Sequence, residues 1–532
     1  MLFSQTSRIA EVWCAKLLLR PKSASFALIL IFPIVAGSCW GQTLQSGPGT
    51  RATQLPLSGE SKGGGASVQQ TSTPFGGSSV NTLNTQVNVQ GPYAGSALDP
   101  TAASGSFTLT LGEAIRRGLD FNLGKIGADA ASVQAQSQRI VARSSLLPNV
   151  SASASENAAK VDLQAEGFSA SAFGATGFNF PTAVGPFHYY DLRGTLQQSL
   201  LDVTAIHNLR SARQSYNAAT FNVSQTREEV VLAVTATYLQ LMATAALVEA
   251  QRAEVHYAEV SYNQAQAEAD AGNKAPIDAN RSLVEAQTEQ QRLRSQLGDM
   301  QKQKNALARL IGLPLSSELN ITEKLQALPS DSISVEDSVR RSWAQRQDLK
   351  AAEAQLHAAE ESRKAAAAER LPSATVNGYY GLEGTNPNQG AGVFQATASV
   401  SVPIFTGGRI HADAVQADAV VIQRKAELSN ARGVVELDVR NACIDLNVAN
   451  EQVITAQSNQ KLALATLQQS QDRFAVGVAD SVEVVNSQEA LASADHDYVS
   501  SLFSQNLARI SLAHAMGEAE KDIPELFKGN KQ

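Results

Sequence analysis

Residues 271–278 read AGNKAPID, and residues 476–483, which lie 205 positions later, read VGVADSVE. The same offset relates RLIG at residues 309–312 to HAMG at residues 514–517. A repeat of this length indicates that neither half can bury its apolar surface alone. The sequence therefore predicts an elongated assembly with two internal repeats rather than a compact enzyme.

Each repeat is predicted to contain a helix that ends in Leu-Pro, a pair of strands, a long helix, a glycine turn and a further helix. In the first repeat these elements occupy residues 109–146, 149–200, 205–271, 272–276 and 277–311. In the second repeat they occupy residues 335–370, 373–404, 409–476, 477–481 and 482–516. The order of elements is therefore expected to be the same in both halves.

The long helix has the pattern of a coiled coil. Apolar residues recur every seven positions, at Val234, Leu241, Val248, Val255 and Tyr262. At 1.5 Å per residue this helix is roughly 100 Å long, and each shorter helix is about half that length. We expect the chain to descend the long helix, turn, climb halfway on the next helix and finish the climb on the first helix of the second repeat. Two short helices placed end to end then match one long helix, with the strands at one end and Gly272 and Gly477 at the other.

The predicted strands alternate strictly between apolar and polar residues. In the last strand the apolar positions are Phe394, Ala396, Ala398, Val400, Val402 and Ile404. Such alternation over about ten residues is typical of a tilted strand with lipid on one face and a water-filled lumen on the other. It also fits a soluble sheet with one solvated face. Four strands behind a signal peptide, with no covering domain, favour the membrane. Because four strands cannot enclose an aqueous channel, several chains must share one barrel.

The strand segment is longer in the first repeat than in the second. From Leu-Pro to the strand end it spans 53 residues in the first repeat (201 minus 148) and 33 in the second (405 minus 372). The additional residues, near 167–186, are mainly Gly, Ala, Ser and Phe, a composition typical of a surface loop. The sequence predicts a longer external loop in this strand pair.

The first 41 residues have the features of a signal peptide. An apolar run at residues 26–35 follows basic residues and is shorter than a membrane-spanning helix. Cleavage after Gly41 fits this pattern. Residues 36–39 (AGSC) also resemble a lipoprotein cleavage box, which makes Cys39 a candidate lipidation site. Only Cys443 lies beyond this leader, so no intrachain disulfide is expected.

The remaining boundaries follow from composition and from the repeats. Residues 42–106 are rich in Gly, Ser, Thr and Gln and are predicted to be a disordered linker. The first repeat is assigned to residues 107–314, an equatorial connection to 315–334 and the second repeat to 335–518. Residues 519–532 are expected to form a C-terminal tail.

Charge and composition argue against several classes of function. The formal net charge is -7 and no basic patch with interleaved aromatic residues occurs, so we expect no nucleic-acid partner. The seven histidines have no metal-ligand spacing, and four methionines do not make a copper relay. No nucleophile, base and orienting residue can be named together. We expect no enzymatic activity, no cofactor and no metal site.

Several short motifs occur in a fixed order along the chain. They are Leu-Pro at 371–372, PIFTGG at 403–408, RFAVG at 473–477 and SVEV at 481–484. With these motifs, residues 108–517 resemble the TolC-like outer-membrane efflux protein family. The resemblance implies an α+β membrane protein, a homotrimer with a 12-stranded outer-membrane β-barrel on a long periplasmic α-helical coiled-coil barrel.

The resemblance also implies function and partners. The protein would be the passive outer-membrane channel of a tripartite efflux or type I secretion system, surrounded by outer-membrane lipid. Its helical tunnel would dock onto an inner-membrane pump of the RND or ABC type through a periplasmic adaptor protein. A periplasmic coiled-coil adaptor or a structural rod is the alternative, and the alternating strands argue against it.

The family's periplasmic gate lies at the end with the glycine turns. By position in the motif, the acidic residues of the family's gate correspond to Asp278 and Glu483. At a second position where the family has an acid, this chain has Asn486, and where the family has the arginine of the closing link, it has Ala479. This gate is therefore expected to be held shut differently, or more loosely, than in the best-known member of the family.

Helix capping is the alternative role of these acids: Asp480 followed by Glu483 resembles a capping box, and Pro276 suits a first helical turn. An acid near a helix N-terminus is favourable by about 0.3–1 kcal/mol.

Overall fold

The computed structural model describes most of the chain beyond residue 82 and short segments before it. The described residues are 51–53, 55, 66–72, 83–100, 105–163, 165, 182–272, 275–328, 334–386 and 388–528. Residues from Pro48 onward form one compact unit. The predicted signal peptide with Cys39, most of the predicted linker and most of the predicted external loop lie outside the described residues.

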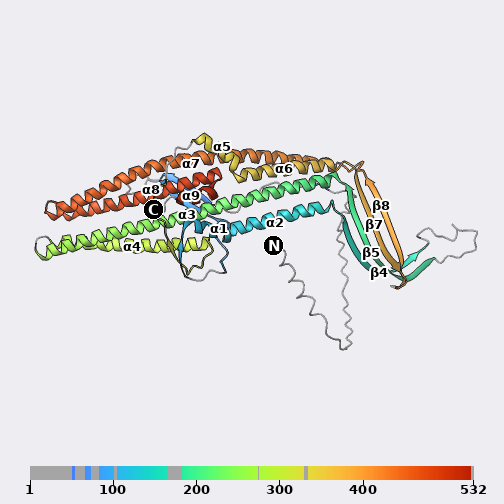
Figure 1. The fold of residues 1–532 in the computed structure, drawn as a ribbon, viewed down its shortest axis with the longest axis horizontal. Helices are drawn as coiled ribbons and strands as arrows, with labels where there is room; N and C mark the ends of the chain where they lie inside the picture. Colours follow the sequence, from blue (N-terminus) through green and yellow to red (C-terminus); the bar gives the residue numbers. More distant parts are fainter. Residues whose placement is uncertain are drawn as a thin grey trace, which may run out of the picture. The chain divides into compact units, whose positions relative to one another are not determined.

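Both halves of this unit have the same order of elements (Figure 1). The first half contains α1 (Leu111–Phe121), α2 (Leu123–Ser144), β4 (Asn149–Asp162), β5 (Ala183–Leu201), α3 (Val203–Asp270) and α4 (Pro276–Leu310). The second half contains α5 (Val335–Gln345), α6 (Gln347–Ala368), β7 (Ser373–Gly384), β8 (Ala391–Ser401), α7 (Arg409–Ala475) and α8 (Ser481–Met516). The predicted long helices, turns and strand pairs are therefore present with nearly the predicted bounds.

Four strands form one antiparallel sheet in the order β4-β5-β7-β8. Because directly paired residues share a face, the register separates the side chains by polarity. One row joins Val150, Leu196, Gly378 and Ala396, and the adjacent row joins Ser151, Thr195, Tyr379 and Gln395. One face of the sheet is thus largely apolar and the other largely polar, as the alternation predicts.

The helices form a single layer that continues from the sheet. Near the sheet, α3 packs between α2 and α6, and α6 packs against α7; near the turns, α3 packs between α4 and α8, and α8 packs against α7. Figure 1 shows α2 and α4 in line on one side of α3, and α6 and α8 in line on the other. Short helices thus lie end to end as predicted, but within each half rather than in the consecutive order that the chain path suggested.

Two predicted helices are each broken at one residue. The segment 109–146 is divided at Asn122, and the segment 335–370 at Arg346, and both residues have extended ψ angles of 132° and 126°. Asn122 is fully buried and its side chain caps α2 through the amide of Gly124 at 2.8 Å. Arg346 is buried and its guanidinium contacts Asp348 at 2.7 Å and Asp438 at 3.1 Å. Neither break contains proline or glycine, which explains why the sequence pattern did not reveal it.

An equatorial core surrounds the middle of α3. It combines α1, the ends of α4 and α8, the short parallel strands β3 (Ser106–Leu109) and β6 (Glu318–Ile321), and α9 (Ala519–Lys528). Within the described residues, α3 alone has an apolar window long enough to cross a membrane, and 72% of that window is buried in the protein. Burial in the equatorial core explains why this stretch of α3 carries no charge, and a membrane is not needed to explain it.

The prediction of a disordered linker is wrong where the structure describes this segment, and the segment predicted as the tail is partly helical. Inside 42–106, β1 (Ala66–Ser72) pairs with β2 (Leu83–Val89), and a short 3₁₀ helix, η1 (Gly91–Ala94), packs against α2 and α4. The predicted tail contains α9, in which Ile523 is fully buried. Composition was misleading because these segments add to a core that other elements form, and need no core of their own.

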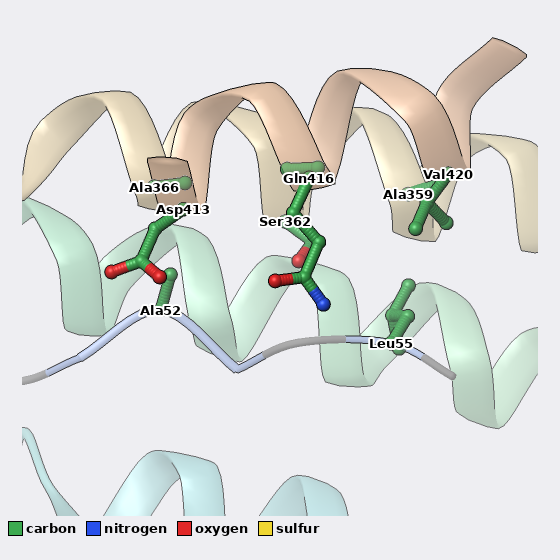
Figure 2. A pocket seen from close by; sticks show the side chains of 9 residues that line it. Ala52, Leu55, Ala359, Ser362, Ala366, Asp413, Gln416 and Val420 are labelled. Carbon is green, nitrogen blue, oxygen red and sulfur yellow. The ribbon is translucent and has the colours of Figure 1, made fainter. Parts of the chain in front are cut away.

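Residues 51–53 and 55 also pack against the helices near the sheet (Figure 2). The amide of Ala52 donates to Glu369 Oε1 at 2.7 Å, and the amide of Thr53 donates to Asn208 Oδ1 at 2.9 Å. Leu55 packs against the small apolar cluster around Ala359. The cavity beside this segment has a volume of about 10 Å³, which is room for no more than one water molecule. We assign it a packing role.

Candidate functional site at the glycine turns

The two long helices end in equivalent turns. Gly272 follows α3 with φ of 72°, and Gly477 follows α7 with φ of 74°. A Cβ atom at either position would meet no atom within 4 Å, so the left-handed backbone, not crowding, is what favours glycine. Each turn reverses the chain within a few residues, which places the starts of α4 and α8 at the end of the layer opposite the sheet (Figure 1).

The starts of α4 and α8 are stabilised differently. α4 begins with Pro276 in its first turn and has no side-chain cap, whereas the carboxylate of Asp480 caps α8 by accepting from the amide of Glu483 at 3.0 Å. The predicted capping role is therefore confirmed for Asp480. The carboxylates of Asp278 and Glu483 do not cap, which leaves them available for other contacts.

Asp278 connects the two turns. Its Oδ1 accepts a hydrogen bond from the hydroxyl of Ser481, the first residue of α8, at 2.9 Å. Arg281, one helical turn along α4, lies 3.9 Å from the same oxygen. The side chain of Asp278 is 25% exposed. The contact with Ser481 links the α3–α4 hairpin to the α7–α8 hairpin within one chain.

Glu483 instead pairs within its own hairpin. Arg473, in the last turn of α7, places Nε 3.2 Å from Glu483 Oε1. The structure thus brings both predicted acids to the same end of the layer, but each faces an arginine. The sequence analysis did not identify Arg473 and Arg281 as partners; their positions near the turns, ten and three residues from the acids, were the available signal.

The other two positions taken from the family motif make no ionic contact at this site. Asn486 is exposed on α8. Ala479 packs against the apolar cluster of Leu467, Phe474, Val484 and Leu491. Four apolar residues next to the turns are exposed, and together they are called the apolar rim: Ile277, Val476, Val478 and Val482, at 56%, 74%, 68% and 43%.

Above the turns, the interface between the two hairpins is polar. Gln488 of α8 donates to the hydroxyl of Ser261 on α3 at 3.0 Å. Within the second hairpin, the hydroxyls of Ser470 and Ser487 lie 2.8 Å apart and are buried. Hydrogen bonds of this kind have a modest net free energy, so the hairpins can separate at less cost than two apolar surfaces.

Further along this interface, carboxyl groups of three helices gather. Glu254 of α3 is 4% exposed, and burial together with the charges of Asp495, Glu289 and Glu285 raises its pKa to about 8. Burial and a hydrogen bond with Glu289 raise the pKa of Glu285. Burial also raises the pKa of Asp495. The sequence analysis did not identify this cluster, because its members come from α3, α4 and α8.

The described residues include no group of three His, Cys, Asp or Glu side chains placed to hold a metal ion. Cys443 is buried against the second half of the helical layer, and burial raises the pKa of its thiol. A buried thiol of raised pKa is chemically inert.

The sequence matches the pattern of the family described as outer membrane efflux protein over residues 126–313 and 339–518. The toluene efflux pump outer membrane protein TtgF of Pseudomonas putida is 25% identical over 323 residues, which cover 58% of this chain and 65% of that protein. The chain thus spans just under two thirds of the length of this curated relative.

Solved structures share the fold. The outer membrane channel CmeC of Campylobacter jejuni superimposes with a TM-score of 0.67 at 16% identity, covering 79% of this chain and 89% of that one. The open state of the MtrE outer membrane channel of Neisseria gonorrhoeae gives a TM-score of 0.63 at 17% identity, covering 88% and 98%.

Proposed function

This chain belongs to the outer membrane efflux protein family, and we propose that it is the outer-membrane channel of a tripartite efflux or type I secretion system. In this role it is a passive duct, and an inner-membrane pump of the RND or ABC type supplies the energy through a periplasmic adaptor. No reaction is required of the channel. The two internal repeats supply its two hairpins and two strand pairs.

The four-stranded sheet is the observation that supports this proposal most strongly. Its register gives one apolar and one polar face, and the outer edges of β4 and β8 pair with no further strand among the described residues. Long unpaired strands of this kind normally need a partner. Another copy of the chain provides it by pairing its β4 with β8, and lipid then covers the apolar face.

The helices support the same mode of assembly. Near the sheet, the outer helices of the layer are α2 and α7, which adjoin β4 and β8 in the chain. On α2, apolar residues at a spacing of seven remain exposed: Ile126, Val133 and Ile140 at 41%, 61% and 57%. On α7, Val415 and Ile422 are 53% and 70% exposed. A second copy would bury both rows in a coiled-coil contact.

The number of copies follows from the barrel. Two copies would give eight strands, which leave an interior that side chains fill, whereas three copies give twelve strands and room for an aqueous lumen. A homotrimer is therefore the smallest closed assembly that conducts. The rod or adaptor alternative leaves the apolar face of the sheet uncovered, which disfavours it.

The apolar rim at the glycine turns supports the adaptor contact. Val476, Val478, Val482 and Ile277 are exposed at the end of the helices farthest from the sheet. Exposed apolar residues next to charged groups are typical of a protein interface. In the proposed topology this end faces the inner membrane, where the adaptor and the pump lie.

Isolation of the protein tests the proposal. We expect it to fractionate with the outer membrane, to migrate in SDS without heating as an oligomer of three chains, and to form channels in planar bilayers. A protein that fractionates as a soluble monomer and forms no channel would support the rod instead.

We further propose that Asp278 and Glu483 line a gate. Because each acid faces an arginine, the closed gate holds paired charges, and removal of the acids leaves Arg281 and Arg473 unbalanced. The double variant Asp278→Asn, Glu483→Gln should shift ion selectivity toward anions and weaken block by divalent cations in planar-bilayer recordings. Trimer assembly should remain intact, since each helix-end charge contributes only about 0.3–1 kcal/mol.

A matched control separates the gate from general surface charge. Asp299→Asn removes an exposed carboxylate from α4, paired with Lys302, far along the helix from the turn. It should leave selectivity unchanged. If the double variant also conducts like the unmodified channel, Asp278 and Glu483 do not line the narrowest part of the pore.

The external loop predicts the order of proteolysis. Residues near 167–186 should face the cell exterior, whereas the turn at Gly272 should face the periplasm. Protease added to intact cells should therefore cleave near 167–186 first and reach Gly272 only after the outer membrane is permeabilised. Mapping of the fragments by mass spectrometry checks this, and the reverse order would contradict the topology.

A further inference from the structure

Glu254 is a buried carboxyl group that has no hydrogen-bond partner in the part of the chain that the structure describes. It lies on α3 where this helix packs against α4 and α8, and only 4% of its surface is exposed. Its Oε1 atom is fully buried and accepts no hydrogen bond from any described residue. A buried carboxylate in this position is costly, so the protonated form is favoured.

The carboxyl groups around Glu254 are better satisfied. Glu289 of α4 is also 4% exposed, but it accepts hydrogen bonds from Gln251 and pairs with Arg292. Asp495 of α8 accepts from Gln460 of α7 at 2.7 Å. Of these three carboxyl groups, Glu254 is therefore the one with neither a hydrogen bond nor an ion pair among the described residues.

The charges that act on Glu254 are all negative. Glu285 and Glu289 face it from α4, and Asp495 faces it from α8. Glu489 of α8 acts in turn on Glu285, while the nearby cation, Arg292, is engaged by Glu289. An ionised Glu254 would therefore repel both helices that pack against α3.

We infer that Glu254 is a proton-operated latch between the two hairpins: protonated, it lets α8 pack on α3 and α4, and deprotonated, it drives the hairpins apart. This inference rests on the proposed function, because separation of the hairpins would widen the end of the tunnel that holds Asp278 and Glu483. The polar contact between Ser261 and Gln488, between the cluster and the turns, can break as the hairpins separate.

The direction of the pH effect follows from the pKa. Burial and neighbouring carboxylates raise the pKa of Glu254 from 4.5 to about 8. The closed packing therefore binds the proton more tightly than the separated state, so its stability is fully present below pH 4.5 and is lost as pH rises through 8. The deprotonated fraction rises from about 1% at pH 6 to about 90% at pH 9 for a pKa of about 8.

Single-channel recordings at pH 6 and pH 9 test the latch. The open probability of the unmodified channel should rise several-fold between these values. Glu254→Gln introduces an uncharged side chain of the same shape, so this variant should have the low open probability of pH 6 at both pH values. Glu249→Gln replaces an exposed carboxylate on the same helix and should retain the pH response. The same comparison in the Asp278→Asn, Glu483→Gln background tests whether Asp278 and Glu483 cause the pH response, because that background lacks both carboxylates.

A second variant tests the mechanism without altering Glu254. Asp495→Asn removes a negative charge that raises the pKa of Glu254, so the midpoint of the transition should move to lower pH. Spin labels at the exposed positions Val260 of α3 and Ala490 of α8 should report a larger separation at pH 9 than at pH 6.

The outcomes distinguish the latch from the proposed function. Conducting channels whose open probability and label separation ignore pH, or whose pH response survives Glu254→Gln, would refute the latch and leave the channel function intact. Absence of conductance at every pH would refute the channel function itself, and the label distances would still show whether Glu254 separates the hairpins.

Discussion

Arginine in place of Ala396 should abolish assembly in the outer membrane. Ala396 lies at the centre of β8, in the row with Gly378 and Leu196 on the apolar face of the sheet. A charge at the middle of the bilayer costs about 2–4 kcal/mol, and a trimer would contain three such charges. Val400 is a weaker test position, because it lies one residue from the end of β8, where the cost falls to about 0–1 kcal/mol.

The neighbouring residue is the matched control. Thr397 belongs to the polar face and pairs with Asn377, so Thr397→Arg should point into the lumen and assemble normally. The amount of SDS-resistant trimer in outer-membrane fractions measures both variants. Equal amounts of trimer for the two would mean that neither face of this sheet contacts lipid.

Much of the fold could be predicted because its signals are local. Strict alternation predicted β8, and the glycine turns fixed the ends of α3 and α7 to within one residue of Asp270 and Ala475. The positions of α4 and α8 followed from Pro276 and Asp480. In each case a short stretch of sequence determines the backbone by itself.

The missed features depend on contacts between distant residues. The helix breaks at Asn122 and Arg346 are held by tertiary contacts, and Arg346 reaches Asp438 across 92 positions of the chain. The two breaks nevertheless occupy equivalent positions in the two repeats: 346 minus 122 gives 224, the same offset as between the helix starts at Leu111 and Val335. Only the packing of three helices makes Glu254 unusual among the many glutamates of the chain.

The candidate site was predicted in part for the same reason. Position in the motif brought Asp278 and Glu483 to one end of the helices, as the structure has them. Their contacts with Ser481, Arg281 and Arg473 depend on side-chain directions at the turns, which sequence alone does not give. The charge balance of the site, and with it the expected change in selectivity, therefore required the structure.

Replacement of Tyr238 by alanine should loosen the equatorial core. Tyr238 lies on α3 and is fully buried, and its single hydroxyl proton is shared between the carbonyl oxygen of Leu109, at 3.0 Å, and the carboxylate of Glu323. Burial, and secondarily Glu323, raises its pKa, so the hydroxyl stays protonated and keeps donating. Truncation of a buried aromatic residue to alanine costs about 3–5 kcal/mol.

Hydrogen exchange measures this loss locally. A loss of 3–5 kcal/mol raises the equilibrium constant for local opening, and with it the exchange rate, by about a hundred-fold or more. This increase should appear in the amides of α1 and of β3, which pairs with β6. Tyr238→Phe keeps the ring and should cost about 1–3 kcal/mol, because Leu109 loses its donor while Glu323 still accepts from the amide of Leu111. Tyr262→Ala, at a half-buried position of the same helix, should leave α1 protected. Unchanged exchange of α1 in Tyr238→Ala would mean that this core does not hold the short helices on α3, and that the layer alone positions the turns and their charges.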